Sequence, residues 1–158
     1  MSHPLTAARV LGLAIAVLAL STPAVAQSDP AYQRQVASSL AHSSLMNNAL
    51  EHRFQALSQG YRSGYIHVGK GNYQTETYHL EAGYLYLFLG ACDEDCSDMD
   101  MALISSDGQS ILAQDTDPDD TPAVQYEPNR TGEYTLVVKA PNCNAFAGCY
   151  WGVQALWK

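Results

Sequence analysis

The chain has 158 residues, and 8 Lys and Arg against 16 Asp and Glu give it a formal charge of −8. Only 15% of the residues are charged and 47% are hydrophobic, which excludes a disordered acidic tail because such segments lack apolar side chains. The negative charge also argues against non-specific binding to nucleic acid, whose phosphates would be repelled. This length allows one ordinary domain, or one small domain plus an appendage.

Residues 1–26 resemble a secretory signal peptide. Arg9 supplies the positive charge, residues 10–20 form an apolar core, and a small-residue motif ends at Ala26. Eleven apolar residues are too few to span a bilayer as a helix, which needs about 20 residues. An uncleaved anchor is the alternative. We expect an exported protein, periplasmic or secreted, with no membrane span after cleavage.

Residues 27–60 are predicted to be a helical segment with one amphipathic α-helix over residues 29–58. Asp29 can cap the helix, Pro30 suits its first turn and Gly60 suits its exit. We expect the apolar stripe to cover its own domain, and the alternative is that it docks a partner or self-associates to form an oligomer. The stripe consists of Tyr32, Val36, Leu40, Met46, Leu50, Phe54 and Leu57.

Residues 61–158 show the pattern of short strands separated by turns, which predicts an antiparallel β-sandwich. A turn is expected at residues 69–72, and a strand at 80–90 has apolar residues on both faces, so both faces should be covered. Met99, Met101 and Leu103 form one face of the next strand, and the opposite face includes two aspartates. Further strands are expected at 111–113, 123–126, 134–138 and 150–157.

The four cysteines lie in two local pairs, Cys92 with Cys96 and Cys143 with Cys149. Four cysteines allow three pairings, and an exported protein favours disulfides over free thiols. We expect the two local loops to close. A four-cysteine zinc site is the alternative, although its usual spacing and reduced thiolates fit less well.

Acidic residues are concentrated in one part of the chain. Twelve of the 16 carboxylates lie between residues 92 and 133, where Arg130 is the only basic residue. Such a density of oxygen ligands suits Ca²⁺, which takes about six to eight oxygens in irregular loops. An EF-hand does not fit, because counting from Asp115 places Asp120 where glycine is needed. The alternative is that these aspartates form turns and a solvated rim.

Motifs for catalysis are missing from the sequence. It has no G-x-S-x-G elbow and no H-E-x-x-H motif, and its histidines lack metal-ligand spacing. Paired carboxylates could serve a small secreted hydrolase only if a cleft held them at the required separation. Tyrosines crowd residues 61–86, where they can pack in a sheet or bind sugars and peptides. We expect a protein that is not an enzyme.

The second half of the chain resembles a known family. Residues 90–101, the Asp107-Gly108 turn, Gly132-Glu-Tyr134 and the closing 143–151 segment are similar to the bacterial pre-peptidase C-terminal (PPC) domain, in its disulfide-bearing variant from small exported proteins. The likeness covers residues 65–158 and implies a jelly-roll-like β-sandwich. Some relatives bind calcium, collagen or other polymers. The calcium ligands that the likeness implies are Asp98, Asp100, Asp93 and Asp95, followed by Asp115 and Asp117.

These observations predict a signal peptide at 1–26, a helical segment at 27–60 and a PPC-like β-sandwich domain at 61–158. We expect a calcium-stabilised binding module for an extracellular or envelope protein or polymer. A structural or assembly subunit is the second interpretation, and a small hydrolase is the third.

Overall fold

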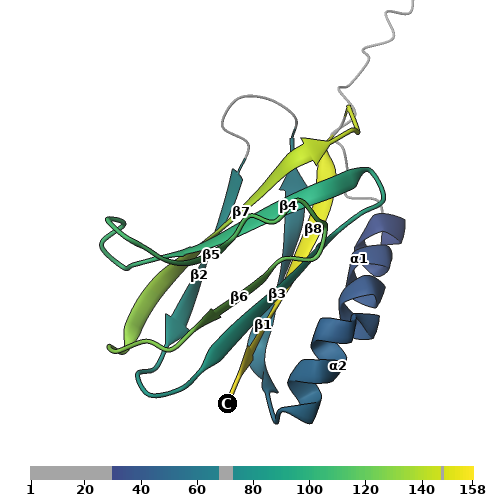
Figure 1. Cartoon of the computed structure of the whole chain (residues 1–158). Helices are drawn as coiled ribbons and strands as arrows, with labels where there is room; N and C mark the ends of the chain where they lie inside the picture. Colours follow the sequence, from purple (N-terminus) through teal and green to yellow (C-terminus); the bar gives the residue numbers. More distant parts are fainter. Residues whose placement is uncertain (1–29, 68–72, 147) are drawn as a thin grey trace, which may run out of the picture.

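The structure is a computed structural model, and it describes residues 30–67, 73–146 and 148–158. Two short helices precede a series of strands along the chain (Figure 1). The elements are α1 (Pro30–His42), α2 (Ser44–Glu51), β1 (Gln55–Ile66), β2 (Tyr73–Leu80), β3 (Tyr86–Cys92), β4 (Cys96–Ile104), β5 (Ile111–Asp115), β6 (Ala123–Tyr126), β7 (Gly132–Cys143) and β8 (Cys149–Trp157).

The strands form two antiparallel sheets of four strands, which pack face to face. The first sheet, called sheet A below, has the order β1-β8-β3-β6, and the second, sheet B, has the order β2-β7-β4-β5. The helices lie on the outer side of sheet A, so the molecule has three layers: helices, sheet A and sheet B (Figure 1). The predicted antiparallel β-sandwich with an N-terminal helical segment is confirmed.

The main core lies between the two sheets. Met99, Met101 and Leu103 of β4 are fully buried there, as their alternation predicts, and Phe88 and Trp151 of sheet A belong to the same cluster. Burying large side chains such as these contributes about 1.5–3 kcal/mol each to the hydrophobic free energy of folding. Alternate residues of β4 therefore point to the outer face of sheet B.

A second, smaller core lies between the helices and sheet A. Val36 and Leu40 of α1 and Ala49 of α2 are buried against Leu89 and Leu156. A Cβ atom at residue 152 of β8, which is glycine, would lie only 2.7 Å from Val36 Cγ1, so this glycine lets α1 approach the sheet closely. The predictions that the helical segment covers its own domain and that the strand containing Leu89 is covered on both faces are both confirmed.

The predicted single helix over 29–58 is wrong in its extent. The chain leaves the helical conformation at Ser43, whose side chain accepts a hydrogen bond from the Met46 N–H at 3.0 Å and caps α2. This break shifts the phase of the second helix, so Leu50 is 55% exposed and Ala49 is buried instead. The helix ends at Glu51, and β1 begins at Gln55, before the expected domain boundary at residue 61.

The predicted strand over 80–90 is also wrong in its first half. Leu80 ends β2, a turn follows with Gly83 at φ +86°, and β3 begins only at Tyr86. Such a positive φ favours glycine and ends the extended conformation. The predicted turn at 69–72 lies outside the described residues. The strands before and after it belong to different sheets, because β1 pairs with β8 and β2 pairs with β7.

Both local disulfides are confirmed, Cys92–Cys96 and Cys143–Cys149. Each joins a strand of sheet A to a strand of sheet B, and the two lie at the same end of the sandwich because Cys96 and Cys143 are register partners. The zinc alternative is therefore wrong, since all four cysteines, each within the described residues, are disulfide-bonded. Two disulfides indicate an oxidising environment.

The predicted signal peptide, residues 1–26, lies outside the described residues. Among the helices that the structure describes, none has the length and apolar character needed to cross a membrane.

Candidate functional site

The first predicted metal ligands lie in the loop between β3 and β4, and there they hold the backbone. Asp93 is only 2% exposed, and its carboxylate accepts a hydrogen bond from the Tyr150 N–H at 2.8 Å. Burial raises the pKa of this carboxyl, and the charges of Asp95 and Glu94 raise it further. The backbone carbonyl of Asp95 accepts a hydrogen bond from the Asn144 N–H at 2.8 Å. Asp93 and Asp95 thus tie this loop to β8 and to the second disulfide loop.

Asp98 and Asp100 lie on the outer face of β4, on the side that the alternation predicts. Burial raises the pKa of the Asp100 carboxyl, and the charges of Asp98 and Asp115 raise it further, while Lys139 on the neighbouring strand lowers it. Asp98 Oδ1 is buried without a hydrogen-bond partner among the described residues. The structure therefore brings Asp98, Asp100 and Asp115 within electrostatic range of one another.

The second acidic loop, residues 115–122, is organised by its own aspartates. Asp115 accepts hydrogen bonds from the N–H groups of Asp117 at 3.1 Å and Ala123 at 2.8 Å, one on each carboxylate oxygen. Asp119 caps the Thr121 N–H in the same way at 2.9 Å, and its carbonyl accepts from the Met99 N–H at 2.8 Å. Asp117 is exposed. These side chains act as turn formers, which is the alternative that the sequence left open.

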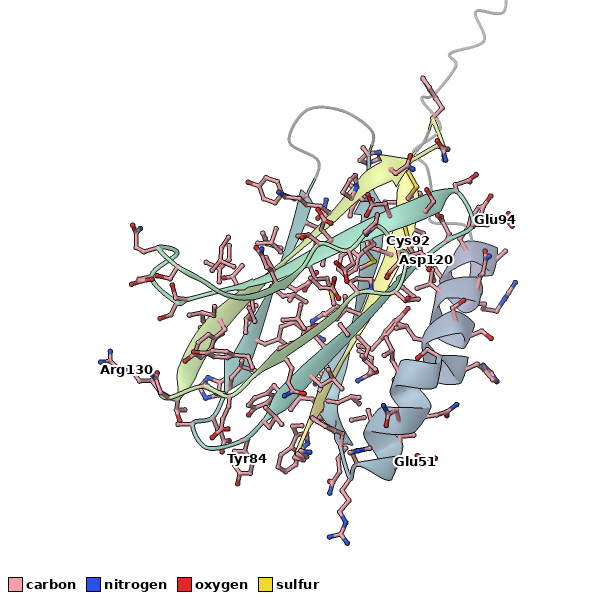
Figure 2. All side chains as sticks on the ribbon, viewed as in Figure 1. Glu51, Tyr84, Cys92, Glu94, Asp120 and Arg130 are labelled. Carbon is pink, nitrogen blue, oxygen red and sulfur yellow. A yellow bond between two sulfur atoms is a disulfide. The ribbon has the colours of Figure 1, made fainter. Side chains whose placement is uncertain are left out.

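The predicted calcium ligands thus do not form one cluster: Asp98 and Asp115 lie within electrostatic range of Asp100, whereas Asp93, Asp95 and Asp117 lie in loops. Figure 2 shows Cys92, Glu94 and Asp120 toward one end of the sandwich, where the two acidic loops lie. In the described part of the chain, no group of three or more His, Cys, Asp or Glu side chains is placed so that it could hold a metal ion. Calcium binding stays a prediction.

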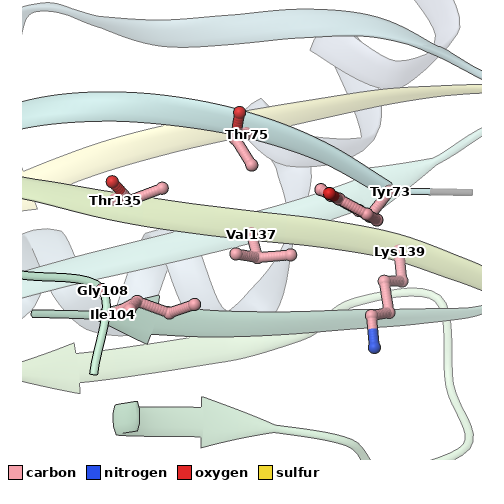
Figure 3. A pocket seen from close by; sticks show the side chains of 7 residues that line it. All are labelled: Tyr73, Thr75, Ile104, Gly108, Thr135, Val137 and Lys139. Carbon is pink, nitrogen blue, oxygen red and sulfur yellow. The ribbon is translucent and has the colours of Figure 1, made fainter. Parts of the chain in front are cut away.

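A hollow on the outer face of sheet B is a site that the sequence motifs did not indicate. It has a volume of about 660 Å³, and its lining residues come from β2, β7, β4 and the turn after β4 (Figure 3). Tyr73, 53% exposed, stands at one end of it, opposite Lys139 in the register of β2 and β7. The lining residues are Tyr73, Thr75, Ile104, Gly108, Thr135, Val137 and Lys139.

The floor of the hollow follows directly from strand alternation. Val137 of β7 lies opposite Thr75 of β2 on one side and Ala102 of β4 on the other, and Thr135 lies opposite Ile104. Directly opposite residues of antiparallel strands share a face, so these side chains form two rows across sheet B. The rows could be derived from the sequence once the strands were paired. The sequence alone does not show that the helices leave this face open.

The charged side chains of this outer face include Asp98, Asp100, Lys139 and Glu133. Lys139 is the register partner of Asp100, and His79 Nδ1 lies 3.0 Å from Glu133 Oε1 near the other end of β2. The floor between these pairs is uncharged. The outer face of sheet B, called the open face below, is thus a mixed polar and apolar surface with an uncharged floor.

Comparison of the chain with protein-family models finds no match, and comparison with curated proteins finds no similar sequence. The likeness to the PPC domain therefore remains a prediction from the residues quoted above.

Proposed function

We propose that this protein is an exported, non-enzymatic binding module, and that its open face recognises an extracellular or envelope polymer or protein. One observation carries the proposal: the outer faces of the two sheets differ. The apolar residues on the outer side of sheet A are buried beneath α1 and α2, whereas the open face presents a hollow whose lining includes Tyr73, more than half exposed.

The size and the chemistry of the hollow support binding rather than catalysis. Its volume of about 660 Å³ falls within the range of about 300–1,000 Å³ that is usual for ligand sites. Among the described residues, its lining contains threonine, aliphatic, tyrosine and lysine side chains but no histidine, carboxylate or thiol that could act as a general base or nucleophile. A surface of this kind holds a ligand by shape and hydrogen bonds.

Export and calcium are further parts of the proposal. The signal-like residues 1–26 and the two disulfides support a periplasmic or secreted location.

The PPC-like motif and the repulsion among Asp98, Asp100 and Asp115 support stabilisation by Ca²⁺, which would neutralise them. The assembly interpretation has less support, because the apolar stripe of α1 is already buried on sheet A.

The proposal is tested by retention experiments with the immobilised full chain and the envelope and medium fractions of the source cells. The key variant is Val137→Arg, which places a long charged side chain in the floor of the hollow. The matched control is Leu50→Arg, which adds the same charge at an exposed position of α2 on the opposite side of the molecule. Unchanged thermal melting shows that each variant is folded.

We expect wild type and Leu50→Arg to retain the same component and Val137→Arg to lose it. Equal retention by all three proteins would contradict the use of the open face. Loss with Leu50→Arg alone would favour the assembly interpretation, in which the helices dock a partner.

A further inference from the structure

The open face restricts the chemistry of its ligand in two ways. The lining of its hollow contains a single charged side chain among the described residues, Lys139, and its uncharged side chains combine hydroxyl groups with one exposed aromatic ring. We infer that this face binds a segment of an uncharged polysaccharide. This inference rests on the proposed function and names the ligand class of that same site.

The hollow itself offers little to an ionic ligand, because Lys139 is the one charged side chain in its lining within the described residues. Asp100 is the register partner of Lys139 and offsets its charge, while Asp98 and Glu133 lie elsewhere on the face, outside the lining. The whole chain carries a formal charge of −8, which repels anionic polymers at long range. A cationic partner would be drawn to the aspartates of residues 93–100 and 115–120, none of which lines the hollow. The open face is therefore best suited to a neutral ligand.

Hydroxyl groups are placed along two adjacent strands of this face. Thr75 and Thr77 of β2 alternate onto it, and Thr135 of β7 is the register partner of Thr77. Each hydroxyl can both donate and accept a hydrogen bond. Sugar hydroxyls have the same double capacity, so the hydroxyls of the ligand and of the threonines can hydrogen-bond to each other without any charged group.

Apolar surface lies between these hydroxyls. Val137 and Ile104 line the hollow, and the Tyr73 ring, 53% exposed, stands at one end of it. The C–H face of a sugar ring packs on such surfaces, and the tyrosine hydroxyl keeps a polar tip in contact with water. A stable protein interface would call for a wider apolar patch with several aromatic anchors. Within the described part of the chain, the lining contains only one aromatic ring, which favours a sugar chain over a protein.

The face is long enough for an extended chain. Residues two apart on a strand are separated by about 6.8 Å, so the stretch from Tyr73 to Thr77 measures about 14 Å. A hollow of about 660 Å³ along this stretch has room for a short run of sugar units. Val137→Arg should therefore block the chain in the middle of its path.

The test uses the full chain and a panel of polysaccharides. The neutral probes are cellulose, chitin, amylose and dextran, and the anionic probes are alginate and heparin. We expect retention on at least one neutral probe, unchanged when NaCl is raised to about 1 M, because no ion pair contributes. Tyr73→Ala should weaken that retention about ten-fold, and Thr75→Val should weaken it several-fold while preserving shape. The control Phe146→Ala removes a fully exposed aromatic ring elsewhere and should change nothing.

The inference is overturned if no neutral polysaccharide is retained, if an anionic probe binds in a salt-sensitive way, or if Tyr73→Ala and Val137→Arg leave retention unchanged. A dimer in sedimentation that Val137→Arg dissociates would also overturn it, because a second copy would then occupy the face. The retention experiment on cell fractions separates this failure from that of the proposed function. If Val137→Arg abolishes capture of a protein there while no glycan binds, the open face is a binding site and only the ligand class is wrong.

Discussion

Truncation of Leu40 tests whether the helices cover sheet A, on which the contrast with the open face depends. Leu40 in α1 is 3% exposed and belongs to the cluster between the helices and sheet A. Leu50 in α2 is 55% exposed because the break at Ser43 shifts the phase of the helix. The same change, leucine to alanine, can therefore be made at a buried and at an exposed position within the same helical segment.

The expected costs differ several-fold. Leu40→Ala removes three buried carbon groups at about 0.8 kcal/mol each, and the cavity left behind adds to this transfer loss. We expect the free energy of unfolding to fall by about 3 kcal/mol, within the range of about 2–5 kcal/mol for buried leucines. Leu50→Ala removes a side chain that is already half in water, so its cost should stay below about 1 kcal/mol.

The assays are urea denaturation, which gives the free energy of unfolding, and thermal melting of the oxidised full chain. Both are followed by circular dichroism and tryptophan fluorescence. A loss of about 3 kcal/mol should lower the melting temperature by about 10 °C in a domain of this size. Equal costs at the two positions would refute the reasoning, because a continuous helix over residues 29–58 would bury Leu50 as well as Leu40. A negligible cost at Leu40 would show that the helices do not cover sheet A.

Three further predictions concern the carboxylates and the disulfides. Asp93→Asn keeps an acceptor for the Tyr150 N–H and removes a buried charge. Because burial raises the pKa of Asp93 in the folded state, the charge costs nothing below the ordinary carboxyl pKa and destabilises the fold as pH rises through the raised value. In urea denaturation the variant should therefore match wild type near about pH 3 and exceed its stability near about pH 7; parallel pH profiles would contradict this. Added Ca²⁺ at about 10 mM should raise the melting temperature, and EDTA should reverse this rise. The rise should be smaller in Asp100→Asn. An equal rise with NaCl of the same ionic strength would indicate charge screening alone and contradict calcium binding. Mass mapping of the unreduced protein should find cross-links within 92–96 and within 143–149, and a peptide joining the two loops would refute that pairing.

Several elements could be predicted from the sequence because their physical signals are local. The alternation of Met99, Met101 and Leu103 predicted a half-buried strand, and the structure buries all three. Close spacing predicted both disulfides, since a short loop brings its cysteines together whatever the topology. Turn residues such as Asp107 act through hydrogen bonds to neighbours within two residues, among them the Gln109 N–H at 3.0 Å.

Predictions that needed the phase or the pairing of elements were less successful. Ser43 lies inside the stretch predicted to be one helix, but its side chain caps a new helix and changes which leucine is buried. The acidic residues looked like one site because they are close in sequence. In the structure Asp93 is clamped to β8, Asp115 holds its own loop, and Asp98 and Asp100 lie on the outer face of sheet B.

The sequence by itself determined the class of fold, the acidic character and the disulfide framework, because composition, alternation and spacing are properties of neighbouring residues. The tertiary structure alone decided which sheet is covered. That choice depends on contacts between residues far apart in the chain, such as Val36 against residue 152, where only glycine leaves room for α1. Once the helices occupy sheet A, the threonine and valine rows of sheet B are left facing solvent, and the candidate binding site exists because of that asymmetry.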